Sequence, residues 1–276
     1  EVVDYTKVLV LDFLASALAG RQVNGIFNEI VVKVVCSMGG AEQSSILFGN
    51  QKLPACNAAF INGVYGHGAD IDDGHRTAQG HPGVAVIPAI LALAEAENSA
   101  IEDVIAAIVA GYDVYVRLSN AVMPSLFLRG FHGTGTVGAV AAGAAAARLL
   151  NLDKDGVKRA ISLAAVQASG LFEISESGQM AKPINPGNAA RTGMLSALLA
   201  KEGSDAPQKP LEGNKGFFKA FADEVNESAI TDGLGQRFKV TECYIKLYPA
   251  CRHLHGVVDA AARHYKNGVP IYQIDK

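Results

Sequence analysis

Apolar residues recur at helical spacing through most of residues 1–220, which is typical of helices that bury one face. The first such stretch ends at Gly20, where we expect the helix to stop, and Pro54 is well placed to open a later one. We therefore expect a mainly α protein. The predicted helices cover residues 5–20, 54–70, 83–98, 100–122, 136–153, 153–170 and 186–203.

These helices are rich in alanine and glycine and poor in polar faces, so they are expected to pack closely on several sides. Residues 130–147 contain no Asp, Glu, Lys or Arg, but Ala, Gly, Thr and His contribute little to membrane transfer. We expect a buried helix there rather than a membrane span. No repeat of fixed period is present, which argues against a solenoid.

The pattern changes toward the C-terminus. Residues 237–250 alternate and are β-branched or aromatic, which predicts a strand. A helix is expected over 251–268 and the start of another strand over 269–276. We therefore predict an all-helical domain over residues 1–235 and, over 236–276, the beginning of an α+β domain that is cut off.

Composition narrows the class of protein. A net charge of −3 and a pI near 6.2 give no reason to expect nucleic-acid binding. The four cysteines fit neither a CxxC pair nor a zinc ribbon and are expected to be reduced. The first residues lack the basic region of a signal peptide, so we expect a cytoplasmic protein without a membrane segment.

The segment "GTGTVG", residues 133–138, matches the GxGxxG dinucleotide fingerprint. That fingerprint requires a preceding parallel strand, whereas "MPSLFLRGFH" precedes it here. Glycines for close helix packing are the better interpretation. The helix N-terminus after His132 still offers free N–H groups that favour an anion.

The stretch "HGADIDDGHRTAQGHP", residues 67–82, concentrates titratable groups in an apolar chain. A metal site would use His67, Asp70, His75 and His81, but no usual metal-ligand spacing is present. Helix capping would explain an aspartate but not three histidines. Acid–base chemistry fits better, because histidines near carboxylates and apolar walls exchange protons near neutral pH.

Two further segments carry candidate chemistry. Lys182 lies in a proline-stiffened loop before a helix that carries Arg191, an arrangement that would suit a carboxylate clamp, although a solvated surface lysine is equally compatible. "KLYPACRHLHG" places His253 and His255 at the start of a helix, with Lys246 upstream. These histidines could pair on a metal or simply be structural.

Taken together, six segments in this order resemble the MmgE/PrpD family: "NAAFINGVYGHGADIDDGH", "HPGVAVIPAILALAE", "RGFHGTGTVGAVAAGAAAARLLNLD", "KPINPGNAARTGMLSALLAKEG", "LEGNKGFFKAF" and "KLYPACRHLHGVVDA". The family includes 2-methylcitrate dehydratase, cis-aconitate decarboxylase and an iminodisuccinate epimerase. The resemblance implies a large all-helical domain, a smaller α+β lid, an active site in the cleft between them, and a homodimer. Family chains are longer, so we expect this one to lack most of the lid.

The resemblance also assigns residues. Carried over motif by motif, the family's catalytic positions fall on Asp70, His81, His132, Lys182 and His255. Further substrate contacts are expected from Asp73, His75 and Arg191. Decarboxylase-like members carry a threonine after the aspartates, where this chain has Gly74, and the missing hydroxyl argues against cis-aconitate decarboxylation.

The leading hypothesis is a lyase, independent of metals and cofactors, that dehydrates a 2-methylcitrate-like hydroxy acid. His81 and His132 would carry the proton transfers, in an order that the sequence leaves open. The alternatives are epimerisation or decarboxylation by the same proton abstraction, or a truncated, non-catalytic paralogue that binds carboxylates or dimerises.

Overall fold

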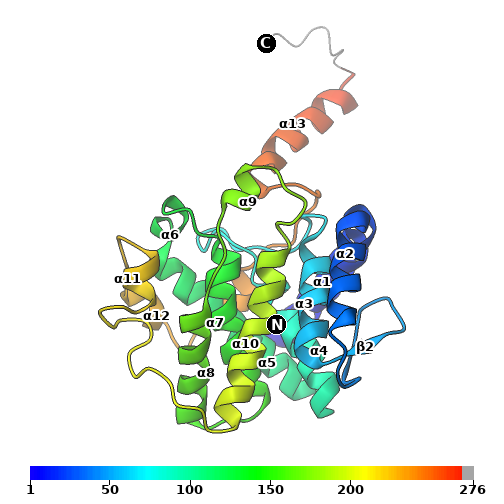
Figure 1. The fold of residues 1–276 in the computed structure, drawn as a ribbon. Helices are drawn as coiled ribbons and strands as arrows, with labels where there is room; N and C mark the ends of the chain where they lie inside the picture. Colours follow the sequence, from blue (N-terminus) through cyan, green and yellow to red (C-terminus); the bar gives the residue numbers. More distant parts are fainter. Residues whose placement is uncertain (269–276) are drawn as a thin grey trace.

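Helix α7 (Gly133–Leu149) lies at the centre of a helical body in the computed structural model, which describes residues 1–268 (Figure 1). It packs against α4, α5, α8 and α10, and every one of its residues except Arg148 is buried. Small side chains let the neighbouring backbones approach: a Cβ at Gly193 of α10 would lie 2.5 Å from the backbone nitrogen of Gly143. The alanine- and glycine-rich sequence thus produces the tightly packed core that we predicted.

The other helices surround this core, and the bounds of all elements follow. They are α1 (Val2–Val23), α2 (Gly25–Ser37), β1 (Ser44–Ser45), β2 (Lys52–Leu53), α3 (Ala55–His67), α4 (Gly83–Glu97), α5 (Ile101–Val122), α6 (Ser125–Leu128), α8 (Lys154–Gln167), α9 (Glu173–Glu176), α10 (Ile184–Lys201), α11 (Phe217–Phe221), α12 (Ser228–Thr231), the 3₁₀ helices η1 (Lys239–Glu242) and η2 (Arg252–Leu254), and α13 (His255–Lys266). The mainly α class is confirmed. Within residues 1–268, the named strands are an antiparallel pair of two residues each.

Helix α1 does not stop at Gly20, as the sequence led us to expect, but continues to Val23. The glycine serves a close approach instead. A Cβ on Gly20 would meet the carbonyl oxygen of Tyr65 at 2.0 Å and the Cα of Gly68 at 3.0 Å. Gly20 therefore lets α1 lie directly against the end of α3, next to the stretch rich in histidine and aspartate.

The strand predicted over residues 237–250 is wrong. This segment forms η1 and then a single bridge, in which Tyr244 and Gly74 exchange backbone hydrogen bonds of 3.0 and 2.8 Å. The alternating apolar residues instead pack η1 against α1 and α5. The predicted helix over 251–268 is confirmed as η2 and α13, and α13 extends away from the helical body (Figure 1). The strand predicted over 269–276 lies outside the described residues, and the boundary near residue 235 stays a prediction.

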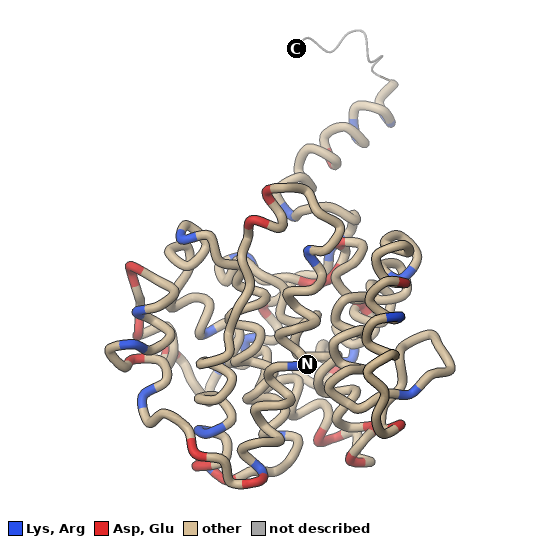
Figure 2. Tube along the Cα trace, in the orientation of Figure 1, with Lys and Arg blue, Asp and Glu red and all other residues tan. Residues whose placement is uncertain are grey.

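Charged residues of both signs are interspersed around the helical body rather than gathered on one face (Figure 2). Among the described residues, no helix is both long and apolar enough to cross a membrane.

Candidate active site

The stretch 67–82 leaves the end of α3 and returns to the start of α4 as a tightly folded loop. His67 is the last residue of α3, and Asp70 has a left-handed backbone with φ of 51°. A bridge between His75 and Gly80 closes the following turn. This path brings residues at both ends of the loop together.

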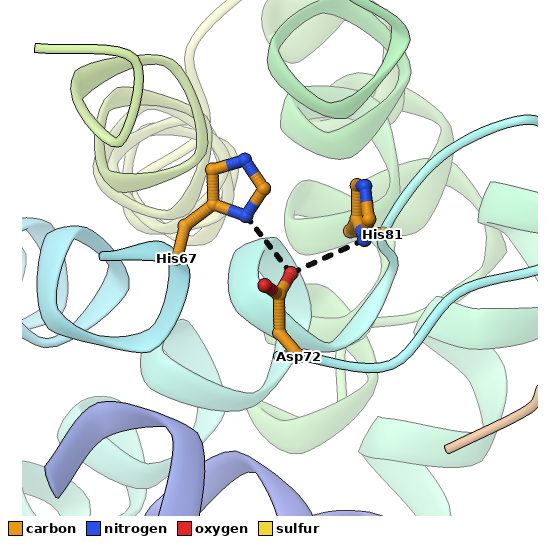
Figure 3. A group of neighbouring side chains, drawn as sticks. All are labelled: His67, Asp72 and His81. Atoms are coloured by element: carbon orange, nitrogen blue, oxygen red, sulfur yellow. Dashed lines mark hydrogen bonds and ion pairs between the residues drawn. The ribbon is translucent and has the colours of Figure 1, made fainter. Parts of the chain in front are cut away.

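One carboxylate oxygen of Asp72 interacts with two histidine rings (Figure 3). Asp72 Oδ2 lies 2.9 Å from His67 Nδ1 and 3.2 Å from His81 Nδ1, and the two rings are 5.0 Å apart. His81 Nδ1 also lies 2.7 Å from the carbonyl oxygen of Asp73. A carbonyl oxygen only accepts hydrogen bonds, so His81 carries a proton on Nδ1 and, when neutral, a lone pair on Nε2.

The charges of this cluster are strongly perturbed. Burial alone would raise the pKa of Asp72, but the neighbouring His67 and His81 outweigh it and hold that pKa well below its usual range. Burial lowers the pKa of His81 to about 4, although Asp72 opposes the shift. Near neutral pH, Asp72 is therefore ionised and His81 is an unprotonated base with its lone pair on Nε2.

A third histidine enters from the N-terminus of α7. His132 is 5% exposed, and its ring lies 6.1 Å from that of His67 and 5.7 Å from that of Phe172. The side-chain nitrogen of Asn185 lies 3.1 Å from His132 Nδ1. Burial, reinforced by the neighbouring His67 and Lys182, holds the pKa of His132 well below its usual value.

Two lysines converge on Asp70. Lys246 Nζ donates hydrogen bonds to the carbonyl oxygen of Asp70 at 2.7 Å and to its Oδ1 at 2.8 Å, and Lys182 Nζ lies 3.7 Å from the same Oδ1. Burial would raise the pKa of Asp70, but Lys182 and His67, together with Lys246, lower it. Lys246 is buried against Asp70, whereas Lys182 is partly exposed, so Lys182 is the ammonium group that an anionic ligand could reach.

These groups open on a pocket of about 400 Å³, within the usual size range for small-molecule sites. His67, Asp70 and Lys182 provide part of its polar wall, and the rest of the lining comes from the end of α1 and from the segment around α9. Lysines, a basic imidazole and a buried carboxylate in one place can bind a carboxylate and move a proton beside it.

The remaining predicted residues lie elsewhere. The buried carboxylate of Asp73 faces Tyr112 and the N–H of Gly83, and His75 lies near Glu242 at 3.5 Å. Arg191 lies on α10 near Cys56; burial raises the pKa of that thiol, and Arg191 opposes the shift. His255 contacts the carbonyl oxygen of Ala250. The structure thus brings Asp70, His81, His132 and Lys182 together. The catalytic role of His255 and the substrate contacts by Asp73, His75 and Arg191 stay predictions.

Sequence reasoning missed four members of the cluster. His67 was considered only as a metal ligand, Asp72 as a cap, and Lys246 as a neighbour of the histidines, while Asn185 carried no signal. Asp72 and Lys246 are respectively 1% and 4% exposed, yet nothing in the chain spacing marks them as buried. The high density of acids and histidines was the one usable signal for His67 and Asp72.

His67, Asp72 and His81 also have the residue types of a metal site, with potential ligand atoms within 4.8 Å of one another. In the arrangement described, however, His81 Nδ1 carries a proton toward Asp73 and both Nδ1 atoms face Asp72. A cation bound through these atoms would have to break those hydrogen bonds. The same geometry suits proton transfer without rearrangement.

Known proteins are similar to this sequence. The MmgE/PrpD N-terminal domain model matches residues 1–228. A cis-aconitate decarboxylase of Aspergillus terreus is 33% identical over 274 residues, which cover 94% of this chain and 55% of that protein. The human cis-aconitate decarboxylase is 28% identical over 270 residues, covering 95% and 55%. A cis-aconitate decarboxylase-like protein of Aspergillus oryzae, oryM, is 27% identical over 291 residues, covering 100% and 60%.

This chain spans little more than half the length of these relatives. The matched region includes every residue of the cluster except Lys246, which lies beyond the domain model but within segments resembling the family. Both the domain match and the 33% identity extend over most of the chain. The chain therefore belongs to the MmgE/PrpD family.

Proposed function

We propose that this chain forms the helical part of a lyase that acts on a small di- or tricarboxylate by proton transfer at a carbon next to a carboxylate. The observation that carries the proposal is a cluster of three histidine rings and two lysines, of which His67 and Lys182 line one pocket. These groups come from four segments of the chain: the loop over residues 67–82, the start of α7, the loop before α10 and the segment after η1.

Carboxylate binding is supported by the charges. Lys182 is partly exposed at the pocket, whereas Lys246 is buried and bonded to Asp70. A carboxylate would complete the pairing of Lys182, and the free N–H groups at the start of α7 would favour an anion nearby. Arg191 is retained as an expected further contact.

Proton transfer is supported by the histidines. A neutral imidazole with a fixed lone pair accepts a proton from carbon more readily than an imidazolium, and the lowered pKa of His81 keeps that ring neutral. We expect His81 and His132 to be the proton-handling residues and Asp72 to orient His81.

Two reactions, which differ in the substrate bond that breaks, remain as proposals. The relatives named cis-aconitate decarboxylase support decarboxylation of a cis-aconitate-like acid. Gly74 favours dehydration of a 2-methylcitrate-like hydroxy acid, because the decarboxylase-like threonine is absent. A Cβ at Gly74 would lie 2.6 Å from the hydroxyl oxygen of Tyr244, so the Tyr244 ring occupies the space that a threonine side chain would need.

A cytoplasmic location and a homodimer are also proposals. The four cysteines are free, which agrees with a reducing compartment. Large apolar side chains lie exposed along α1 and α2, among them Leu11 at 67%, Ile26 at 75% and Ile30 at 56%. Such a face favours coverage by another protein surface, and light scattering coupled to size exclusion would test for a dimer.

The test is to incubate the protein with 2-methylcitrate, citrate, cis-aconitate and iminodisuccinate while following alkene absorbance and CO₂ release. Lys182→Met should strongly raise KM or abolish turnover. Lys201→Met, which removes an exposed lysine paired with Glu97, is the matched control. Carboxylate binding without turnover would favour the non-catalytic alternative. The absence of both binding and turnover would refute the proposal.

A further inference from the structure

The two ring nitrogens of His132 have different surroundings, and Asn185 determines which one carries the proton. Asn185 lies in the first turn of α10, and its side-chain nitrogen is 3.1 Å from His132 Nδ1 and 3.3 Å from the carbonyl oxygen of Leu171. The carbonyl oxygen can only accept, so the Asn185 atom facing both partners is the amide nitrogen. An amide N–H only donates, and His132 Nδ1 therefore accepts.

A neutral imidazole has one donor and one acceptor nitrogen. With Nδ1 accepting, His132 carries its proton on Nε2. Its backbone N–H bonds to the carbonyl oxygen of Gly170 at 2.9 Å, and Phe131 bridges Leu171. The segment that holds the His132 backbone is thus the same one that orients Asn185.

His81 is held in the opposite form. Its Nδ1 donates to the carbonyl oxygen of Asp73 and faces the carboxylate of Asp72, so the neutral ring presents a lone pair at Nε2. One histidine of the cluster is therefore fixed as an acceptor and another as a donor. This difference comes from hydrogen-bond partners, since the two side chains are chemically identical.

We propose that Asn185 is a positioning residue that makes His132 a neutral hydrogen-bond donor through Nε2, while His81 exchanges the proton with substrate. This inference rests on the proposed lyase function. In dehydration, the substrate C–H bond breaks, an N–H bond forms at His81 Nε2, and the electron pair spreads onto the adjacent carboxylate. That pair then forms the C=C bond as the C–O bond breaks, and the leaving hydroxide takes the proton from His81 and departs as water. His132 Nε2–H donates a hydrogen bond to the carboxylate oxygen that gains charge. His132 keeps its own proton, so the proton transfer proposed above for both histidines is narrowed to His81.

The same roles serve decarboxylation. The C–C bond breaks as CO₂ leaves, and the electron pair stays on the substrate carbon and its conjugated carboxylate. His81 takes up a proton from solvent at Nε2 and delivers it to that carbon, which returns the ring to its neutral form. His132 again donates a hydrogen bond to the charged oxygen, so its tautomer matters in either reaction.

The tautomer can be measured without any substrate. In ¹⁵N-labelled protein, long-range ¹H–¹⁵N spectra distinguish protonated from unprotonated ring nitrogens, and His132→Gln identifies the His132 signals. We expect protonated Nε2 and bare Nδ1 in the native protein. In Asn185→Asp, a carboxylate would face Nδ1 and the pattern should reverse. A protonated Nδ1 in the native protein at neutral pH would overturn the inference even if the lyase activity is real.

Kinetic measurements test whether the tautomer of His132 affects catalysis. Losing one oriented donor to a developing oxyanion costs about 10²- to 10³-fold in kcat, so Asn185→Asp should lose about that much with a small change in KM. Asn188→Asp, one turn further along α10 and bonded to Ser169, is the matched control and should keep both tautomer and kcat.

Asn185→Leu provides a second variant should the aspartate fail to fold, and it should leave His132 in mixed tautomers with reduced kcat. An unchanged kcat in a variant whose tautomer has shifted would refute the role of His132 as donor. If no substrate in the panel turns over, the proposed function fails, while the spectra still decide the role of Asn185 in fixing the tautomer.

Discussion

Replacing Asp73 by asparagine should stabilise the protein relative to the native one, by an amount that grows as the pH rises. Asp73 is 2% exposed, and Asp72 and Asp12 lie close enough to repel its charge. Burial, reinforced by those two carboxylates, raises its pKa to about 8, although the hydrogen bond from Tyr112 opposes the shift. The side chain is therefore a neutral acid at pH 7, and asparagine imitates that form.

The magnitude follows from the linkage between protonation and folding. The unfolded chain releases the Asp73 proton near the ordinary pKa of 3.8, whereas the folded protein keeps it up to about 8. Between these values the folded state binds more protons, so the contribution of Asp73 to stability falls with rising pH. This contribution to the free energy of unfolding falls by about 1.4 kcal/mol per pH unit, which amounts to about 3 kcal/mol from pH 5 to pH 7.

Asparagine removes this dependence while keeping the contacts. Its oxygen can accept from the N–H of Gly83 at the position where Asp73 Oδ1 accepts at 3.0 Å, and its amide can donate to the Tyr112 hydroxyl, which lies 2.7 Å from Oδ2. The free energy of unfolding of Asp73→Asn should therefore match the native value near pH 4 and exceed it increasingly up to about pH 8. The difference between the two proteins isolates Asp73 from all other titrating groups.

The assay is urea unfolding followed by circular dichroism at several pH values. Asp205→Asn, at an exposed aspartate, is the control and should run parallel to the native protein. If the free energy of unfolding of Asp73→Asn also runs parallel to that of the native protein across this pH range, the reasoning is refuted. Loss of stability at every pH would show instead that the buried carboxylate is ionised and needed.

Three further predictions concern individual contacts. Asp72→Asn removes the charge shared by His67 and His81 and should lower kcat by about 10²-fold or more, measured on whichever acid of the panel is turned over, with circular dichroism confirming the fold. Gly74→Thr forces a side chain against Tyr244 and should cost about 1–3 kcal/mol in urea unfolding, and an unchanged midpoint would show that the ring moves aside. Arg117→Met breaks a buried ion pair of 2.6 Å with Asp113 and should cost about 3–5 kcal/mol, seen as a lower thermal midpoint, unless water replaces the guanidinium.

The helical class could be predicted because apolar spacing is a local property of the chain. The predicted helices over residues 83–98 and 100–122 correspond to α4 and α5 almost to the residue. Helix α2 was missed because it is rich in valine and isoleucine, which indicate strands at least as strongly as helices. The strand over 237–250 failed because alternation alone supplies no neighbouring strand to pair with.

The site could be predicted only as far as residue types allow. Asp70, His81, His132 and Lys182 were identified through a family resemblance, and the structure brings them together. Asp73 shows the limit: it directly follows Asp72 in the sequence, yet its carboxylate faces Tyr112 rather than a histidine. Adjacent aspartates thus have opposite pKa shifts, and only the fold assigns them.

The division of roles between His81 and His132 has the same origin. In the sequence the two are equivalent, because each is a histidine beside a helix N-terminus. In the structure, a backbone carbonyl and a carboxylate keep the single proton on Nδ1 of His81, whereas an amide N–H donates to Nδ1 of His132. These partners lie 8, 9 and 53 residues away along the chain, so the tautomers, and with them the direction of proton transfer, follow from tertiary packing.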